Sequence, residues 1–356
     1  MPRHDKTSPP GERTPDMPSG TPKPLVAGLG PHGERPATPD LIVLSPEMVE
    51  QARASAFRVA ILLHTTVSDW AQRQIAGIDA GLRQAGAIVV EIVDCAYDPT
   101  RQVAAIERLI RSKLDAVISI PVGSTTVADA FRKISAAGIK LVLLDNAPSG
   151  LLAEIDYVSV VSSDNFGLGQ IAARLLSPHV PRYGSVCVIA YNIDFFATAQ
   201  REIAFNKWMH QERPDVALSH LKFETPDHAG DVIGPLLDQH PDLDGLFVVW
   251  DEPAVASLQM MESRGRQPAM TTVDLGHAIA EALKDGRIVK GVAAQRPFEQ
   301  GLIAATVAIV ALTGNAVPPW IVLPGLAVTA VNVTEAYKDV GGAPASSELM
   351  AFRGRS

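Results

Sequence analysis

The sequence has little of several features that mark common classes of protein. Only two of its 356 residues are cysteines, Cys95 and Cys187, and neither has a second cysteine or a histidine at metal-ligand spacing. Neither a disulfide scaffold nor a structural zinc site is therefore expected. No stretch approaches the roughly 18 consecutive apolar residues of a membrane-spanning helix. Basic residues number 31 against 39 acidic ones, and the net charge of −8 argues against binding to nucleic acid.

Motifs of common catalytic sites are missing as well. The chain contains no GxSxG nucleophile elbow, no GxxxxGK[ST] phosphate loop, no HExxH zinc motif and no CxxC pair. Neither an enzymatic activity nor a cofactor or metal is therefore predicted. One alternative stays open, because Asp145 and Asp274 could act as an acid–base pair, although carboxylates serve equally well as hydrogen-bond acceptors for a bound ligand.

The N-terminal part of the chain differs in composition from the rest. Residues 1–40 hold ten of the 27 prolines, five basic and five acidic residues, and no aromatic residue. Such a segment buries too little apolar surface to offset the entropy lost on ordering, so we predict a disordered Pro-rich tail. Residues 41–56 are expected to be a linker with one short helix at 46–54. The tail lacks the basic stretch, apolar run and cleavage site of a secretory signal.

From residue 57 onward, short β-branched runs alternate with longer stretches whose apolar residues recur at helical spacing. Almost continuously apolar strands separated by amphipathic helices are typical of a parallel sheet covered on both faces. About ten such units exceed one sheet, so we predict an α/β fold of two doubly wound parallel-sheet lobes. The predicted strands are 57–63, 87–93, 115–120, 139–144, 157–161, 185–190, 217–223, 245–250, 270–273, 289–294 and 327–331.

Polar and aromatic residues gather at the carboxyl ends of these strands, where ligands bind in open α/β sheets. Aromatic residues make up only 5% of the chain, yet Trp70, Phe195 and Trp250 all fall there. Aromatic faces beside carboxylates, amides and an arginine suit a polyhydroxylated ring, whose C–H surface packs on the rings while its hydroxyls bond to the polar groups. The composition of these strand ends therefore predicts a sugar-like site.

Other interpretations of these residues stay open. An Asp or Asn at a strand end is more often the N-cap of the next helix than a ligand contact, and this applies most to Asp69 and Asp251. His64 fits equally well as a buried imidazole with satisfied hydrogen bonds, and Arg201 as a surface ion pair with an acidic neighbour such as Glu202. The prediction rests on the coincidence of several strand ends and not on any single residue.

One segment is more specific than the rest. Residues 294–301 read Ala-Gln-Arg-Pro-Phe-Glu-Gln-Gly, which is similar to an AQxPxxxG crossover motif. Asp145 at its strand end, the helix opening Ser163-Asp164-Asn165, Arg201 and Asp274 stand in the matching order along the chain. With these residues, the chain from 57 to 335 resembles a type I periplasmic binding protein of the ribose-binding kind.

The resemblance implies roles for several of these residues. Trp70 takes the place of a phenylalanine that stacks on the sugar ring, and Asp145, Arg201, Asp274 and Gln295 take positions that bond to ring hydroxyls. The complete predicted ligand-binding set is His64, Ser68, Asp69, Trp70, Asp145, Asn146, Phe195, Arg201, Trp250, Asp274 and Gln295.

Two positions depart from the family pattern. Asn146 stands where the family usually has an arginine, which removes a bidentate charged donor. Trp250 stands where the ribose binders carry an asparagine, which replaces a polar contact with an aromatic wall. Both departures argue against ribose itself and favour a different small sugar or polyol.

The family's topology also implies a domain map with a three-segment hinge. The chain would cross between the lobes near residues 159–162, 295–297 and 324–325. The N-terminal lobe would then comprise 57–159 and 296–324, the C-terminal lobe 160–295 and 325–335, and residues 336–356 a C-terminal tail.

The resemblance implies a non-catalytic protein that captures a small sugar or polyol between its lobes and delivers it to the membrane permease of an ABC-type importer. It also implies a periplasmic monomer, whereas a chain that begins as given would be expected to stay in the cytoplasm. The alternative is a ligand-sensing module like the effector domain of lac-repressor-like regulators. The segment before residue 57 is too short for their DNA-binding headpiece of about three helices.

Overall fold

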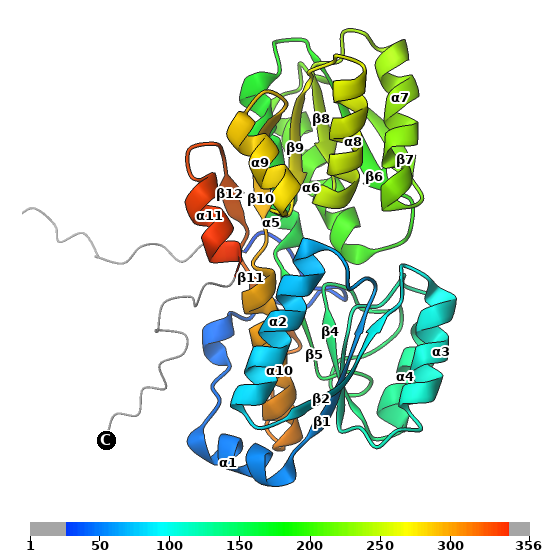
Figure 1. Ribbon diagram of the computed structural model, residues 1–356, viewed down its shortest axis with the longest axis vertical. Helices are drawn as coiled ribbons and strands as arrows, with labels where there is room; N and C mark the ends of the chain where they lie inside the picture. Colours follow the sequence, from blue (N-terminus) through cyan, green and yellow to red (C-terminus); the bar gives the residue numbers. More distant parts are fainter. Residues whose placement is uncertain (1–25, 342–356) are drawn as a thin grey trace, which may run out of the picture.

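The computed structural model describes residues 26–341, which form two α/β lobes stacked along the long axis of the molecule (Figure 1). Each lobe is built on one six-stranded sheet. The predicted fold of two doubly wound lobes is therefore confirmed. Each sheet is covered by helices on both faces, as its continuously apolar strands require.

The strands of the first sheet are β1 (Arg58–Leu63), β2 (Ile88–Asp94), β3 (Ala116–Ser119), β4 (Lys140–Leu144), β5 (Ser159–Ser163) and β11 (Trp320–Leu323). Their order is β11-β5-β4-β3-β1-β2, and all the strand pairs are parallel. Alternate residues of β1 enter two separate cores, one on each face of the sheet. The helices of this lobe are α1 (Pro46–Ser55), α2 (Asp69–Gln84), α3 (Pro99–Leu109), α4 (Ala128–Ala136) and α10 (Pro297–Leu312).

The strands of the second sheet are β6 (Ser185–Tyr191), β7 (Ala217–Phe223), β8 (Gly245–Val248), β9 (Ala269–Val273), β10 (Val289–Ala294) and β12 (Leu326–Val328). Their order is β12-β10-β9-β8-β6-β7, with β12 antiparallel to β10 and the other pairs parallel. The helices are α5 (Asn165–Leu176), α6 (Phe196–Glu212), α7 (Ala229–Gln239), α8 (Asp251–Ser263), α9 (His277–Asp285) and α11 (Val333–Val340). Short 3₁₀ turns lie at Pro39–Leu41, Ser177–His179 and Pro226–His228.

Capping side chains explain where several of these helices begin. The hydroxyl of Ser68 accepts the N–H of Ala71 at the start of α2, and the carboxylate of Asp98 accepts two N–H groups at the start of α3. Asp164 does the same for Gly167 at the start of α5. These caps satisfy N–H groups that have no partner inside the helix. No helix within residues 26–341 is long and apolar enough to cross a membrane.

The chain passes between the lobes three times, and the places differ in part from those expected. β5 belongs entirely to the first sheet, so the first passage follows Ser163 and is later than the expected 159–162. The second passage lies between β10 and α10, and the third between β11 and β12. The second lobe also continues beyond residue 335, because α11 packs against α9. Residues 336–340 of this helix were expected to belong to a C-terminal tail of residues 336–356. Residues 342–356 of that tail lie outside the described part.

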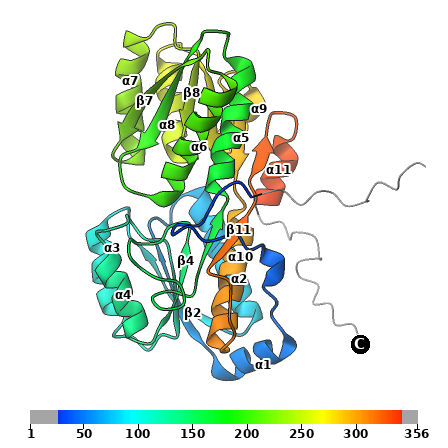
Figure 2. The same cartoon turned by 180° about the vertical axis from the view of Figure 1, so that it is seen from behind.

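Residues 26–40 also differ from the expected disordered tail; residues 1–25 lie outside the described part. The backbone N–H groups of Ala27 and Gly28 donate to the Asp164 carboxylate at 2.8 and 3.2 Å. Ala37 then pairs in parallel with Ile321 at the edge of the first sheet. Figure 2 shows this segment running past the passages between the lobes. Contacts with the lobes offset the entropy that this segment loses on ordering, which the few apolar residues of the segment could not offset alone.

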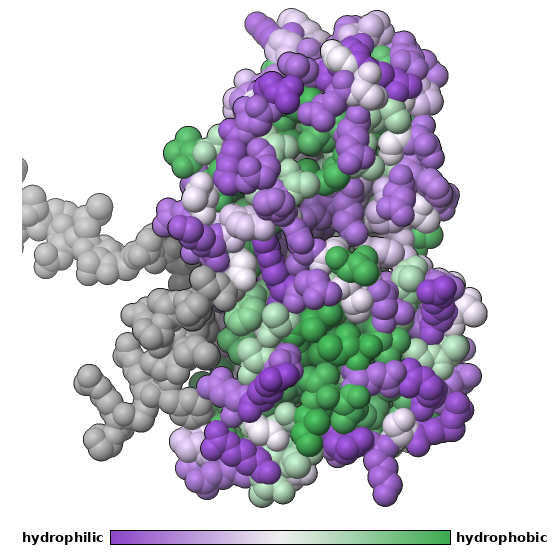
Figure 3. All heavy atoms as spheres, in the orientation of Figure 1, coloured by the Kyte–Doolittle hydropathy of each residue, from purple (hydrophilic) through white to green (hydrophobic). Residues whose placement is uncertain are grey.

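Apolar side chains also reach the surface of the first lobe. Figure 3 shows a group of them over the sheet between α2 and α3. On the edge strand β2, Ile88 and Ile92 remain 47% and 45% exposed. The second lobe is more evenly polar on the face shown (Figure 3).

Helices α2 and α10 pack unusually closely because glycines stand where they touch. A Cβ on Gly77 would overlap the carbonyl oxygen of Phe298, and a Cβ on Gly301 would overlap that of Gln74. The two helices therefore approach backbone to backbone. This contact fixes the position of α10, which begins at the second passage between the lobes.

Replacing Gly77 by alanine should lower the free energy of unfolding by about 1–3 kcal/mol, because the added methyl group overpacks a backbone contact. Chemical denaturation monitored by circular dichroism measures the change. Gln84→Ala, at an exposed position of the same helix, serves as the control and should change stability by less than about 0.5 kcal/mol. Equal stability of Gly77→Ala and the wild type would contradict the close helix contact.

Candidate ligand-binding site

A cavity lies between the lobes, where the carboxyl ends of the strands of both sheets come together. The space between the wall residues measures about 680 Å³ with the solvent at its open mouth included. The first lobe contributes His64, Ser68, Trp70, Tyr97, Ile120, Val122, Gly123 and Asp145 to its wall. The second contributes Tyr191, Ile193, Phe195, Ala197, Thr198, Arg201, Trp250, Asp251, Glu252 and Asp274, with Gln295 at the second passage.

Asp145 and Asp274 occupy equivalent places in the two lobes. Asp145 follows β4 and Asp274 follows β9, and both have left-handed backbone conformations with φ of 55° and 71°. Each donates its N–H at 3.2 Å to a carbonyl of the next strand, Val161 and Ala293 respectively. Aspartate is one of the few residues that adopt this conformation readily. The turn brings one carboxylate from each sheet edge into the cavity wall.

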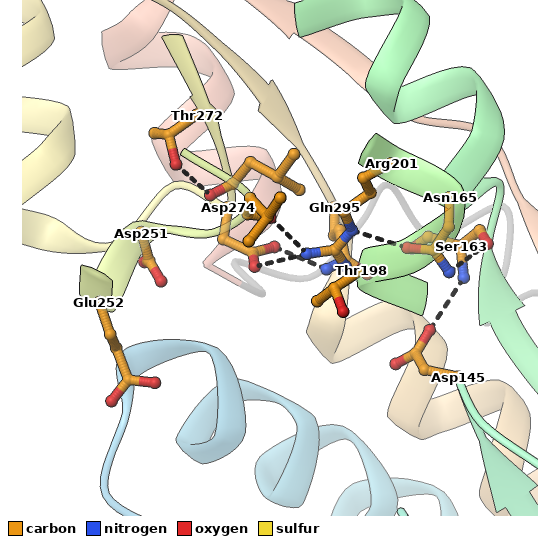
Figure 4. A network of polar contacts seen from close by, with 12 residues as sticks. Asp145, Ser163, Asn165, Thr198, Arg201, Asp251, Glu252, Thr272, Asp274 and Gln295 are labelled. Carbon is orange, nitrogen blue, oxygen red and sulfur yellow. Dashed lines mark hydrogen bonds and ion pairs between the residues drawn. The ribbon is translucent and has the colours of Figure 1, made fainter. Parts of the chain in front are cut away.

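Arg201 lies in α6 and joins the second-lobe side of the site (Figure 4). Its Nε donates to Oδ1 of Asn165 at 2.9 Å, and its Nη1 donates to the carbonyl of Val249 at 3.0 Å. The same Nη1 lies 3.7 Å from Oδ2 of Asp274. Arg201 is only 4% exposed. It is therefore not part of a surface ion pair, which was the alternative interpretation of this residue from the sequence.

The segment that matches the crossover motif supports both aspartates. Gln295 Nε2 donates to Oδ1 of Asp274 at 2.7 Å. Five residues later, in the first turns of α10, Gln300 Nε2 donates to Oδ2 of Asp145 at 2.9 Å. The N–H of Ser163 donates to the other oxygen of Asp145 at 3.3 Å. One short segment therefore orients a carboxylate in each lobe.

Aromatic rings form the remaining walls. The His64 ring meets Tyr97 and Trp70 edge-on, with centroids 5.0 and 5.8 Å apart, and it stacks on Phe195 of the opposite lobe at 6.3 Å. On the second lobe, Trp250 is packed edge-on against Tyr191 at 5.1 Å. The rings thus face the cavity from both lobes.

Burial changes the ionisation of the groups in the wall. It raises the pKa of Asp145 and of Asp251, and it raises that of Asp274 to about 6 although Arg201 opposes the change. Burial also raises the pKa of Glu252. It lowers the pKa of His64 to about 4, so this ring is neutral at pH 7.

Several buried polar atoms of the wall have no hydrogen-bond partner within the described protein. They are Nδ1 of His64, Nε1 of Trp70 and Oε1 of Gln295. Buried polar atoms in folded proteins nearly always have a partner. These three atoms belong to residues of the cavity wall and have unused hydrogen-bonding capacity.

Two residues of the predicted set, Asp69 and Asn146, are not part of the cavity wall. Oδ2 of Asp69 accepts the N–H of His277 at 2.7 Å, which caps α9 of the second lobe from the first. The Asn146 amide donates to the carbonyl of Gly123 at 3.1 Å and accepts the N–H of Phe196 at 3.3 Å. Both side chains bond to backbone groups between or beside the lobes, so the structure does not support the ligand contacts expected of them.

Further contacts between the lobes show that this conformation is closed. The hydroxyl of Tyr97 donates to Glu252 Oε2 at 2.8 Å, and Arg73 Nη1 donates to the carbonyl of Leu275 at 3.0 Å. Arg73 also lies over the ring of Tyr337, 4.6 Å from its centroid. Side chains of the first lobe therefore contact three separate segments of the second.

The structure brings nine of the eleven predicted residues to one cavity, namely His64, Ser68, Trp70, Asp145, Phe195, Arg201, Trp250, Asp274 and Gln295. Ser68 lines the cavity and also caps α2, because its hydroxyl oxygen accepts the N–H of Ala71. The predicted set lacked Tyr97, Tyr191, Asp251 and Glu252, which also line the wall. Tyr97 follows the end of β2, so the strand-end rule would have found it if applied to every strand, and Glu252 lies directly after the predicted Trp250.

The fold and the site together define a two-lobed protein that encloses a small ligand between its lobes. The family model described as "Periplasmic binding protein domain" matches residues 59–316. The chain therefore belongs to the periplasmic binding protein family, and the predicted resemblance is confirmed.

Curated relatives carry ribose in their names. The chain is 26% identical over 248 residues to the ribose import binding protein of Bacillus subtilis, which covers 70% of this chain and 79% of that protein. It is 27% identical over 223 residues to the D-ribose/D-allose-binding protein of Pseudomonas aeruginosa. This match covers 61% of this chain and 69% of that protein.

Solved structures share the fold at lower identity. An ABC transporter solute-binding protein from Agrobacterium vitis, bound with α-D-tagatopyranose, is 24% identical with a TM-score of 0.73, over 79% of this chain and 97% of that one. Another from Actinobacillus succinogenes, with bound D-allose, is 21% identical with a TM-score of 0.71, over 78% of this chain and 99% of that one.

The raised pKa of Asp274 predicts how stability depends on pH. The folded pKa of about 6 exceeds the ordinary 3.8, so the folded protein keeps a proton that the unfolded chain releases. This contribution to stability is fully present below 3.8 and is lost as the pH rises through about 6. The wild type should therefore lose about 3 kcal/mol more than Asp274→Asn between about pH 4 and about pH 7.

Urea denaturation of the ligand-free protein across this pH range measures the difference. Asp238→Asn is the control with the opposite sign, because Arg264 lowers the pKa of the Asp238 carboxyl. The Asp238→Asn variant should lose, at pH values above the ordinary carboxyl pKa, the stability that the ionised Asp238 gives the wild type. Parallel pH profiles of wild type and Asp274→Asn would show that Asp274 is not held in the protonated form.

Proposed function

We propose that this protein is a non-catalytic binding protein that encloses a small sugar or polyol between its lobes and presents it to the permease of an ABC-type importer. The carrying observation is the paired placement of Asp145 and Asp274, one from each lobe, each oriented by an amide of one segment. Carboxylates accept two hydroxyl hydrogen bonds each, and the aromatic rings of the wall cover the C–H faces of a sugar. Members of the family bind their ligands for transport rather than transform them.

Closure couples binding to recognition by the permease. Each lobe carries only half of the cavity wall, so a ligand contacts both halves only in the closed form. Since the ligand binds the closed form better, it shifts the population toward that form. A few kcal/mol of differential affinity is sufficient to make the closed form dominant.

A sensing module was the alternative function. The curated relatives are named as import or sugar-binding proteins, which favours transport. The family description also supports a periplasmic location, and we propose that the protein acts there as a monomer. Its proposed partners are the sugar and the membrane permease, without nucleic acid or cofactor.

A thermal-shift screen over monosaccharides and polyols tests the function. At least one compound should raise the melting temperature, and the same compound should reduce the radius of gyration in small-angle X-ray scattering. A screen without any stabilising compound would contradict sugar binding. Stabilisation without compaction would contradict closure as its mechanism.

Asp145→Asn should weaken binding of the best compound by about ten-fold or more, because an amide accepts at only one of the two carboxylate oxygens. Asparagine also tolerates the left-handed backbone at this position, so the turn that follows β4 is preserved. Isothermal titration calorimetry measures the affinity, with Asp79→Asn on the outer part of α2 as the control. An unchanged affinity in Asp145→Asn would remove this residue from the binding site.

A further inference from the structure

The cavity wall has an imbalance of charge. Four carboxylates line it, those of Asp145, Asp251, Glu252 and Asp274, against the single guanidinium of Arg201. Asp145 and Asp274 have strong donors, because each accepts a hydrogen bond from a glutamine and Asp274 also pairs with Arg201. The imbalance is therefore concentrated on Asp251 and Glu252.

Asp251 and Glu252 have few partners. Oδ2 of Asp251 accepts the N–H of Gly276 at 3.0 Å, and Oε2 of Glu252 accepts the hydroxyl of Tyr97 at 2.8 Å. Within residues 26–341 neither carboxylate forms an ion pair. Asp251 is only 7% exposed. A buried carboxylate is unfavourable in its charged form when no cation lies beside it.

The surroundings of these carboxylates favour a positive charge. The aromatic rings of Tyr97, Tyr191 and Trp250 line the same part of the wall, and ring faces attract cations. Oε1 of Gln295, a side chain only 2% exposed, is a further acceptor without a partner. The wall therefore offers acceptors and aromatic faces, while its one arginine is already paired.

We propose that the ligand is an amino sugar or amino polyol whose ammonium group binds Asp251 and Glu252 beside Tyr191 and Trp250. The proposal rests on the proposed function and names the substrate class of the same site. Asp251 and Glu252 begin α8, whose positive end opposes only part of the penalty that burial places on their ionised forms. Asp145, Asp274 and Arg201 remain for the ring hydroxyls.

Closure strengthens this selection. Glu252 belongs to the second lobe, and the Tyr97 side chain that covers it belongs to the first. Asp69 of the first lobe also approaches Asp251, since both carboxylates lie around Gly276. Closing the lobes therefore brings negative groups together and removes them from water. A bound ammonium compensates these charges, whereas a neutral sugar leaves them uncompensated.

Matched compounds test the proposal by calorimetry on the full chain at about pH 7.5. The sets are D-glucose, D-glucosamine and N-acetyl-D-glucosamine; the corresponding galactose and mannose compounds; and sorbitol with glucamine. In each set that binds, the amine should bind about ten-fold or more tightly than its neutral parent. The N-acetyl compounds have the nitrogen without the charge and should bind no better than the parents.

Glu252→Gln should reduce the preference for the amine to about three-fold or less while the neutral parent still binds. Glu281→Gln, on the surface of α9 and paired with Lys284, should leave the preference unchanged. Neutral parents that bind as tightly as their amines would overturn the proposal and leave the proposed function intact. A complete lack of binding of every amine would also overturn the proposal, while the thermal-shift screen decides separately on the proposed function.

Discussion

The structure depends on two aspartates that face one cavity from opposite lobes. Asp145 and Asp274 each end a central strand in a left-handed conformation, so each carboxylate leaves its sheet edge toward the other lobe. Gln300 and Gln295 orient them, and both glutamines come from the segment where the chain passes between the lobes. The segment that forms the second passage between the lobes therefore also contacts the carboxylate of each half-site.

Closure without a ligand has opposing energetic terms in this molecule. Contacts such as Asp69 with the first N–H of α9 favour the closed form, because a carboxylate at a helix N-terminus is stabilised by the helix dipole. Desolvation of the cavity carboxylates opposes it, as the raised pKa of Asp274 indicates. The balance between these terms determines how much of the binding free energy a ligand must spend on closure.

Much of the fold and site followed from local rules. Strand periodicity predicted both lobes, and the strand-end rule with the family resemblance predicted nine of the cavity residues, because parallel strands direct their carboxyl ends to one edge. Asp69 and Asn146 also stand at strand ends or helix starts, yet they bond across the lobes. Only the angle between the lobes separates these two roles, and this angle results from long-range packing. The attachment of residues 26–40 at Asp164 likewise had no local signal.

The charge of the cavity wall depends on a few side chains. The Asn146 side chain bonds to the start of α6, and Arg201 is the only guanidinium in the wall. Arg201 is committed to Asp274, so no cation remains for the carboxylates that begin α8. Trp250 adds an aromatic face directly before them. The second lobe therefore contributes three of the four carboxylates of the wall, Asp251, Glu252 and Asp274, and the first lobe contributes Asp145.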